Sequence, residues 1–590
     1  MPVRVLLRYV ARYRARYVVG FGFLVATTLC ALAVPWVVKG TIEVLSARTP
    51  GATRAAMTGA LWVVGLALLQ AVSRSASRLL LLGAGQRVEA AIRADLFRHF
   101  LTLSPEFYQA RRTGDLMSRA TNDLQNVAML IGFGSLSLVN TLLVYGGALG
   151  AMLRIDHWLT AAALLPYPLL IGVAKRYNTR VHAQSLAVQE QLGHLSTRVQ
   201  ENLAGSAVVR AYTMEPAQVA AFRRDNAEQR ARVVRLARTQ GTFSPIMGLM
   251  GGLGALTVLW LGGRAVMDGR ITLGAFVAFS SYLAYLAWPT IALGWVLSIV
   301  RRGLAAMGRI LEVLEAQPGV ADGPEVGASP ATDAGVEGTL ELRGLTFGYG
   351  DGRLPALRDV SLTIPAGAFV AVVGPTGSGK STLVQLLSRL WDPPHGTVFI
   401  DGAEIHTIPL AALRQAVVVV PQDAFLFSRA LGENVILGGD ERGLDGSERG
   451  LEWAGRVAGL TDDVARLPHG WRTIVGERGL TLSGGQRQRA TLARALLRGP
   501  RILVLDDAFA SVDAEKEAEI LGRLRQALAG RTTLVITHRL RAARAADHVV
   551  VLDGGRLVEQ GTHEVLLARG GLYARLWRRQ QIETRLEATG

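Results

Sequence analysis

The chain contains only one cysteine, Cys30, which excludes any internal disulfide framework. Lysine is nearly as scarce, so the net charge of +17 at pH 7 comes mainly from arginine. A strong positive charge is typical of nucleic-acid-binding proteins, but here much of the arginine flanks apolar segments. We therefore expect no nucleic-acid partner. The lysines are Lys39, Lys175, Lys380 and Lys516.

Long apolar runs are concentrated in the first half of the chain, which is 50% hydrophobic overall. An apolar run of about 20 residues is long enough to cross a bilayer core of roughly 30 Å as a helix. Several arginines precede the first run, and the positive-inside rule then places the N-terminus in the cytoplasm. We expect six spans, at about residues 17–38, 57–82, 128–152, 158–173, 245–267 and 273–300.

The loops between these spans alternate between short and long. Six spans return the chain to the cytoplasm, so the two long charged stretches, 83–127 and 174–238, are expected to be cytoplasmic extensions of the membrane helices. Independent soluble insertions are the alternative. The pattern predicts a multi-pass protein of the cytoplasmic (inner) membrane, with both termini in the cytoplasm.

Two arginines, Arg74 and Arg78, interrupt the second expected span and share one helical face. A charged side chain that faces lipid is costly, so these arginines should face a cavity or a structural partner, or reach toward the cytoplasm. A cavity arginine would favour anionic or zwitterionic cargo.

The composition predicts three parts: a membrane domain at 1–314, a linker at 315–338 rich in Pro, Gly, Ala and Asp, and a soluble domain at 339–590. In the last part, short β-rich runs alternate with helices. The expected fold class is an α-helical membrane domain of six long transmembrane helices, followed by an α/β domain with a helical subdomain.

A glycine-rich loop follows a buried-strand run at 369–373 and precedes an apolar helix. This is the G-x-x-x-x-G-K-S pattern, in which backbone N–H groups and a lysine surround phosphate oxygens and the serine hydroxyl can hold Mg²⁺. The context makes it a specific signal for ATP and Mg²⁺. The α/β domain is therefore expected to be a P-loop ATPase domain. The predicted nucleotide-binding residues are Gly374, Pro375, Thr376, Gly377, Ser378, Gly379, Lys380, Ser381 and Thr382.

A second nucleotide signal is a strand run, 502–506, that ends in Asp506. A carboxylate there, on a strand beside the phosphate loop, can hold Mg²⁺. We therefore predict Ser381 and Asp506 as metal ligands.

Between these motifs lies the run Leu482-Ser483-Gly484-Gly485-Gln486. It is the signature of ATP-binding cassette proteins, and the whole chain resembles their half-transporter exporters. In that family the signature faces the γ-phosphate of ATP held by the opposite cassette. The resemblance implies two ATP molecules between two cassettes, and hence a second half-transporter chain as partner. The residues expected to contact ATP on this side are Ser483, Gly484, Gly485 and Gln486.

The resemblance assigns roles to three more residues. Tyr349 is similar to the aromatic residue that stacks on adenine, although an aromatic at this point can also be plain core. Gln422 resembles the residue that contacts Mg²⁺ and the attacking water, and His538 resembles the switch histidine at the γ-phosphate. Two stretches, 112–119 and 205–215, resemble the coupling helices that dock on cassettes.

The sequence departs from the family at Asp507, where exporters usually carry the catalytic glutamate. The shorter side chain withdraws the carboxylate by roughly 1.5 Å, and a displacement of about 1 Å can cost on the order of a hundredfold in rate. This pattern resembles the Asp-bearing subunit of bacterial heterodimeric multidrug exporters. The alternative is that Asp507 serves as the base after local adjustment.

The predicted function is ATP-driven export of amphipathic small molecules, lipids or peptides by alternating access. The chain would be one half of a heterodimer with one degenerate ATP site, in contact with membrane lipids and a hydrophobic or amphipathic substrate. The alternative is a homodimeric lipid or drug flippase with a competent Asp507. A soluble cassette protein is disfavoured by the membrane spans, and an importer by the fusion of membrane and ATPase parts. The catalytic residues expected are Asp507, His538 and Gln422, with Gln422 also at the metal.

Overall fold

The computed structural model describes residues 2–47, 51–324, 326, 336–350, 354–437, 448–476, 479 and 481–589. Its contacts divide the chain into two compact units, which we describe separately. The first unit is Met1–Leu101 with Thr113–Ala316, and the second is Thr102–Arg112 with Gln317–Gly590. The expected linker, 315–338, lies partly outside the described residues.

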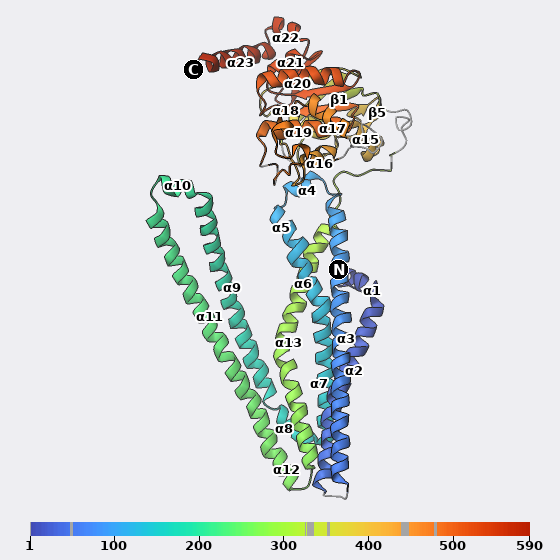
Figure 1. The fold of residues 1–590 in the computed structure, drawn as a ribbon, viewed down its shortest axis with the longest axis vertical. Coiled ribbons are helices and arrows are strands. Elements are labelled where there is room, and N and C mark those ends of the chain that lie inside the picture. Colours follow the sequence, from blue (N-terminus) through green and yellow to red (C-terminus); the bar gives the residue numbers. More distant parts are fainter. Residues whose placement is uncertain are drawn as a thin grey trace. The chain divides into compact units, whose positions relative to one another are not determined.

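The first unit is helical throughout its described residues (Figure 1). Four of its helical segments are long and apolar enough to cross a membrane: Arg14–Ser46, Ala52–Phe100, Thr113–Ile155 and Leu273–Leu314. The helices are α1 (Pro2–Ala11), α2 (Arg14–Ser46), α3 (Ala52–Phe100), α5 (Thr113–Ser118), α6 (Leu124–Met129), α7 (Ser135–Ile155), α8 (His157–Leu164), α9 (Tyr167–Ala204), α10 (Ser206–Ala211), α11 (Glu215–Thr257), α12 (Gly263–Met267) and α13 (Leu273–Leu314), with π-helical turns η1 (Arg119–Asp123), η2 (Leu130–Gly134) and η3 (Val258–Gly262).

The two other expected spans lie on composite helical segments. The span at 158–173 begins on α8 and continues into α9, and the span at 245–267 covers the end of α11, η3 and α12. A shorter apolar helix, Gly252–Met267, lies in the latter. The number of six spans stays a prediction.

Small residues let the helices of the first unit approach closely. Gly85 on α3 faces Gly132, and a Cβ added to Gly85 would lie only 3.1 Å from the Cα atom of Gly132. Close approach at small residues is a common way for membrane helices to associate. A buried carboxylate also joins α13 to η1: the Nε atom of Arg309 on α13 donates to Asp123 at 2.8 Å.

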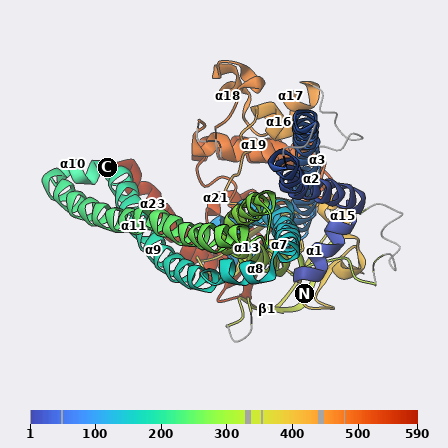
Figure 2. The ribbon, with the colours of Figure 1, turned by 90° about the horizontal axis from the view of Figure 1, so that it is seen from below.

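Helices α9 and α11 pack along each other and are joined by the short helix α10 (Figure 1). Figure 2 shows the same pair side by side, reaching away from α13. Helix α10 lies in the stretch 205–215 that resembles a coupling helix. Several apolar side chains of the pair are exposed, among them Leu186, Leu203, Val208, Tyr212 and Val219.

The second unit contains two sheets. The antiparallel sheet has the order β2-β1-β4-β5, and the six-stranded sheet has the order β10-β9-β3-β8-β7-β6, in which only the β10–β9 pair is antiparallel. The strands are β1 (Leu340–Phe347), β2 (Leu357–Ile364), β3 (Phe369–Val373), β4 (Val398–Ile400), β5 (Ala403–Glu404), β6 (Val417–Val420), β7 (Ile502–Asp506), β8 (Thr532–Ile536), β9 (His548–Asp553) and β10 (Arg556–Gly561).

The central strands β3 and β8 are buried along their whole length, which explains the continuous apolar run of β3 and the absence of charged residues from β8. Side chains of α14 pack with residues of both sheets in one hydrophobic cluster. The helices of this unit are α4 (Pro105–Gln109), α14 (Lys380–Leu387), α15 (Leu410–Ala416), α16 (Leu431–Ile436), α17 (Glu448–Val457), α18 (Thr461–Arg466), α19 (Gly484–Leu497), α20 (Ala514–Ala527), α21 (Leu540–Arg544), α22 (His563–Arg569) and α23 (Leu572–Thr589), with 3₁₀ turns η5 (Ile405–Thr407) and η6 (Gly470–Arg472).

Candidate nucleotide site

The parallel strands β3, β8, β7 and β6 are neighbours in this order, so their carboxyl ends meet at one edge of the sheet. Ligands of such sheets bind at this edge. The chain places one predicted site segment after each strand: the phosphate loop after β3, His538 after β8, Asp506 and Asp507 at the end of β7, and Gln422 after β6. Sequence positions more than 160 residues apart are thereby brought together.

The phosphate loop turns from β3 into α14 through glycines with left-handed backbone. Gly377 has φ +81° and Gly379 has φ +96°. A Cβ on Gly379 would lie 2.6 Å from the carbonyl oxygen of Ala356, so this position has no room for a side chain. The backbone N–H groups that follow begin α14, and the residue before it supplies no side-chain cap. This arrangement fits an anionic ligand.

Lys380 lies over the loop that precedes it. Its Nζ atom is 2.8 Å from the carbonyl oxygens of both Gly374 and Pro375, and 3.2 Å from Ser378 Oγ. Burial lowers the pKa of Lys380, and the carboxylates of Asp507 and Asp506 act in the opposite direction. A charged amine in this position can interact with phosphate oxygens at the start of α14.

The side chains of Ser381 and Asp506, the two predicted metal ligands, interact with each other. Burial raises the pKa of Asp506, while the hydrogen bond from the Ser381 hydroxyl lowers it. A hydroxyl and a carboxylate supply the oxygen ligands that Mg²⁺ prefers. The pair therefore fits a magnesium ion bound next to the phosphates.

Asp507 adopts a left-handed backbone conformation with φ +48°, which is unusual for a residue other than glycine. Its N–H donates to the carbonyl oxygen of Ile536 at 2.8 Å, which fixes the turn after β7 against the end of β8. The Oδ2 atom of Asp507 lies 2.8 Å from Nδ1 of His538. Two of the predicted catalytic residues are thus in direct contact, and Gln422 is exposed at the same sheet edge.

The signature run forms the start of α19. Ser483 Oγ accepts from the N–H of Gln486 at 3.2 Å, and Gln486 Oε1 accepts from the N–H of Ser483 at 2.9 Å. This reciprocal pair is a capping box. Gln486 Nε2 also donates to Asp463, which accepts from Arg489 as well, so the helix start is fixed to α18.

The segment after Asp507 is held by two residues that sequence reasoning did not single out. Gln488, on α19, accepts from the N–H of Ser511 at 2.9 Å. Arg539, next to the predicted switch histidine, donates to the carbonyl oxygens of Ala510 and Val512. The signature helix and the turn after β8 are therefore connected through this segment.

Tyr349 does not lie in the open environment expected of an aromatic residue that stacks on a base. Its hydroxyl lies 3.0 Å from Thr382 Oγ1 and 2.9 Å from Gln385 Oε1, and its ring meets Trp391 edge-on at 4.9 Å. The side chain is half-buried. It thus lies beside the start of α14, next to a predicted nucleotide-binding residue, and its stacking role stays a prediction.

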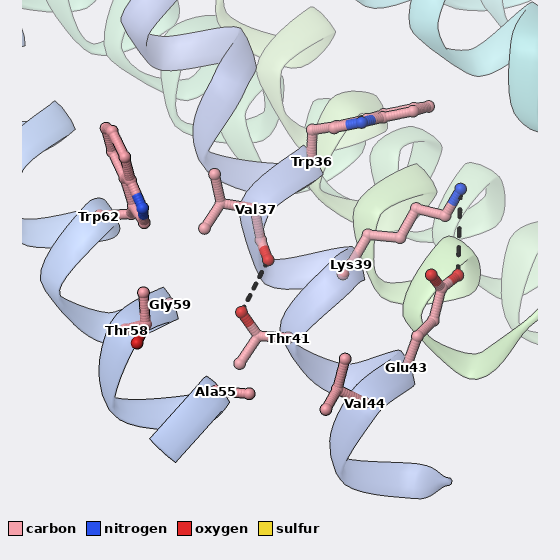
Figure 3. A pocket seen from close by; sticks show the side chains of 11 residues that line it. Trp36, Val37, Lys39, Thr41, Glu43, Val44, Ala55, Thr58, Gly59 and Trp62 are labelled. Atoms are coloured by element: carbon pink, nitrogen blue, oxygen red, sulfur yellow. Dashed lines mark hydrogen bonds and ion pairs between the residues drawn. The ribbon is translucent and has the colours of Figure 1, made fainter. Parts of the chain in front are cut away.

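The first unit contains a separate cavity of about 460 Å³ between α2 and α3. Figure 3 shows Trp36 and Thr41 on one helix and Trp62 and Gly59 on the other. The Lys39 ammonium lies 4.5 Å from the centre of the Trp36 ring, and 3.9 Å from Glu43. Tryptophan with a charged neighbour is typical of the membrane–water interface.

The chain matches two family models. Residues 17–290 match the model of the ABC transporter transmembrane region, and residues 357–510 match the model described as ABC transporter. The predicted fold class, a helical membrane domain followed by an α/β ATPase domain, is thereby confirmed.

Similar proteins extend over most of the chain. A probable multidrug resistance ABC transporter ATP-binding/permease protein, YheI of Bacillus subtilis, is 37% identical over 85% of each chain. An ATP-dependent lipid A-core flippase of Syntrophus aciditrophicus is 35% identical over 83% of this chain and 80% of its own. The structure of a bacterial Atm1-family ABC exporter with ATP bound covers 97% of this chain and 99% of its own, with a TM-score of 0.79 and 28% identity.

Proposed function

Because the chain belongs to the ATP-binding cassette exporters, as a half-transporter with one membrane region and one cassette, we propose that it is the Asp-bearing subunit of a heterodimer. As in other members of the family, its cassette hydrolyses ATP and drives export across a membrane in a dimeric assembly. The identity of the second subunit, the roles of individual residues and the class of cargo belong to the proposal.

On this proposal, the phosphate loop holds ATP through the backbone N–H groups at the start of α14 and through Lys380. Ser381 and Asp506 hold Mg²⁺, with Gln422 as a further ligand. Mg²⁺ neutralises charge on the phosphates, and the chain's own residues position and polarise the attacking water. His538 and Asp507 lie in contact, so the ring and the carboxylate orient each other at the γ-phosphate.

The observation that carries the heterodimer is Asp507 in a chain with an intact signature. A carboxylate withdrawn by about 1.5 Å is poorly placed to take a proton from water. This chain's phosphate loop would then form a slow site. Its signature, at the start of α19, would complete a fast site in which the partner chain supplies a glutamate.

The α9–α11 pair supports a partner chain. Two apolar side chains near the α10 end of this pair, Leu203 and Tyr212, are 72% and 75% exposed. Apolar surface of this kind is stabilised when another protein surface covers it. We propose that the tip formed by α10 docks on the partner's cassette. We also propose that both termini lie in the cytoplasm.

We propose an amphipathic cargo, such as a lipid, a peptide or a small drug-like molecule. Arg74 and Arg78 are exposed on α3, whereas Ser73 and Ser77 on the same helix are buried in the unit. The arginines therefore lie on the side of α3 that a second subunit, a cavity or the cytoplasmic interface can reach. An anionic or zwitterionic head group would match their charge.

The experiment compares ATP hydrolysis by the chain purified alone with hydrolysis after coexpression with a half-transporter chain that has glutamate after its Mg²⁺-binding aspartate. We expect slow turnover alone and a large increase with the partner. Asp507→Glu should accelerate the chain alone by up to about a hundredfold, because the carboxylate regains its reach.

Glu→Gln at the catalytic position of the partner is the matched control and should abolish the fast turnover. If the chain alone hydrolyses ATP rapidly and Asp507→Glu changes nothing, the homodimeric flippase with a competent Asp507 is the correct function. One observation favours that second candidate: the contact between Asp507 and His538 keeps the carboxylate at the nucleotide edge of the sheet.

A further inference from the structure

A cluster of two histidines and one glutamate lies at the antiparallel sheet of the cassette. It shares no residue with the proposed nucleotide site. His395 lies in the turn before β4, Glu404 ends β5, and His406 lies in the 3₁₀ turn η5 that follows. The β4–β5 hairpin brings the two histidines together although 10 residues separate them.

The ligand atoms of the three side chains converge. Glu404 Oε1 lies 3.4 Å from Nδ1 of His395 and 3.2 Å from Nδ1 of His406. One potential ligand atom from each residue lies within 4.8 Å of the other two. Within the part of the chain that the structure describes, no other group of three His, Cys, Asp or Glu side chains meets this condition.

The residues around His406 hold its ring in place, as expected for a metal ligand. The residue is only 6% exposed, and its Nε2 atom has no hydrogen-bond partner among the described residues. Asp392 Oδ1 lies 3.4 Å from this Nε2 atom, without forming a hydrogen bond with it. A metal-bound histidine commonly uses its second nitrogen to contact a carboxylate, which fixes the ring. Here Nδ1 faces Glu404 and Nε2 faces Asp392.

The backbone also fixes the glutamate. The N–H of Gly396 donates to Glu404 Oε1 at 2.6 Å, which stabilises the ionised carboxylate in the position between the two rings. Asp392 is itself paired with Arg389, a 2% exposed side chain at 2.9 Å. The positive charge nearest the cluster is therefore already neutralised by Asp392.

We propose that His395, Glu404 and His406 form a binding site for a divalent transition-metal ion of the Zn²⁺ class. Two imidazoles and one carboxylate match the donor set that zinc accepts, with water in the fourth position. Mg²⁺ and Ca²⁺ prefer all-oxygen ligands, so the two histidines select against them. The site is separate from the Mg²⁺ position proposed at Ser381 and Asp506.

Metal binding requires one movement. The two imidazole rings are stacked, with centroids 4.0 Å apart and planes at 22°. A nitrogen lone pair lies in the plane of its ring, so two nearly parallel rings cannot both point at one ion. His395 can turn, because its side chain is 71% exposed, whereas the buried His406 stays in place. We therefore expect the stack to open when zinc binds.

The test uses the full chain in the detergent-solubilised assembly in which it purifies, carrying a tag without histidine and kept free of nucleotide. Zinc chloride is titrated by calorimetry, and bound metal is counted after gel filtration. We expect one zinc per chain. His395→Ala removes an exposed ligand without disturbing the core, so it should abolish this binding in a folded protein.

His469→Ala is the matched control, because His469 is an exposed histidine of the same domain that lies outside the cluster. It should leave the zinc affinity unchanged. Asp392→Asn, which changes the carboxylate behind His406 and also weakens its pairing with Arg389, should weaken binding by roughly tenfold to a hundredfold. With Co²⁺ in place of zinc, the intensity of the visible absorption bands should indicate tetrahedral coordination in the wild type and be lost in His395→Ala.

The proposal is overturned if the wild type binds no zinc saturably, or if binding survives both His395→Ala and Glu404→Gln. The cluster is then an ion pair and ring stack that only stabilises the hairpin. MgCl₂ at the same concentrations provides the selectivity check, since equal binding of both metals would exclude a site that depends on histidine.

Discussion

The cassette contains two glycine-rich helix starts that differ in what satisfies their first N–H groups. At α14 the preceding residue is Gly379, in a left-handed conformation, and it supplies no side-chain cap. At α19 the preceding residue is Ser483, which forms a capping box with Gln486. The first start leaves its donors to a ligand, whereas at the second start the side chains of Gln486 and Ser483 accept from each other's backbone N–H groups.

This difference suits the two roles proposed for these helices. A start without a cap needs an anion to compensate its donors, so α14 gains most from nucleotide in its own cassette. The capped start of α19 is rigid without a ligand. Ser483 uses a lone pair of its hydroxyl for the cap, and the hydroxyl proton is still available to a phosphate brought by another chain.

The largest effect on the start of α14 is expected from a side chain at Gly379. In Gly379→Ala the methyl group would overlap the Ala356 carbonyl, and the left-handed backbone adds about 1–2 kcal/mol of strain. We expect thermal destabilisation and a loss of ATP affinity on the order of a hundredfold, because the N–H groups move by about 1 Å. Thermal unfolding and equilibrium ATP binding measure the two effects.

Gly377→Ala is the matched control for this substitution. Gly377 has a similar backbone, but a Cβ added there meets no atom within 4 Å among the described residues. This variant should show the strain of about 1–2 kcal/mol and keep most of its ATP affinity. Equal losses in the two variants would mean that backbone strain, and not the contact with Ala356, controls the loop.

The charge that accompanies the α14 start is tested by Lys380→Ala. Hydrogen bonds to charged groups contribute about 1.5–3 kcal/mol, so ATP affinity should fall roughly tenfold to a hundredfold. Lys516→Ala, at the other lysine of the cassette, should leave ATP affinity unchanged. An unchanged affinity in Lys380→Ala would show that the backbone N–H groups alone hold the phosphates.

The start of α14 could be predicted because it is encoded within a few neighbouring residues: the strand run before Gly374 and the glycine spacing identify the phosphate loop. The signature was recognised as a phosphate-binding motif, but the helix start and capping box at Ser483 were not predicted. The carboxylates at the end of β7 were also predictable, since the carboxyl ends of parallel strands share an edge.

What the sequence did not reveal depends on contacts between distant residues. Arg539 and Gln488 hold the segment after Asp507 from two sides, and no local pattern encodes their partners. The contact between Tyr349 and Thr382 likewise joins residues from two elements. In the membrane region, the apolar pattern located long helices, but it could not indicate that α9 and α11 pair with each other and extend from the rest.

The α19 start is tested by Ser483→Ala, which removes the acceptor for the N–H of Gln486. Loss of a serine cap costs about 1 kcal/mol of stability. We expect that loss, unchanged ATP binding at this chain's own phosphate loop, and reduced turnover of the dimeric assembly.

Thr562→Ala removes the N-cap of α22, away from the signature, and should cost a similar amount of stability without affecting turnover. If both variants lower turnover equally, the effect of Ser483 is one of stability. If Ser483→Ala instead weakens ATP binding by the isolated chain, the signature contributes to the site of its own cassette.

The smallest effect is expected from the charge at the metal position, Asp506. Burial raises its pKa in the folded protein above the value in the unfolded chain. The folded state therefore binds a proton more readily, so this group favours folding most at low pH, and its contribution is lost as the pH rises through the folded-state pKa. Asp506→Asn should then raise the unfolding temperature at pH 7 without ATP and Mg²⁺, and the difference should shrink as the solution is acidified.

Asp463→Asn, beside α19, should lower the unfolding temperature at pH 7, because it weakens the ion pair with Arg489. Opposite signs for the two variants would show that the ionised carboxylate is uncompensated at the phosphate side and paired at the signature side. Equal signs would contradict the contrast between the uncapped start of α14 and the capped start of α19.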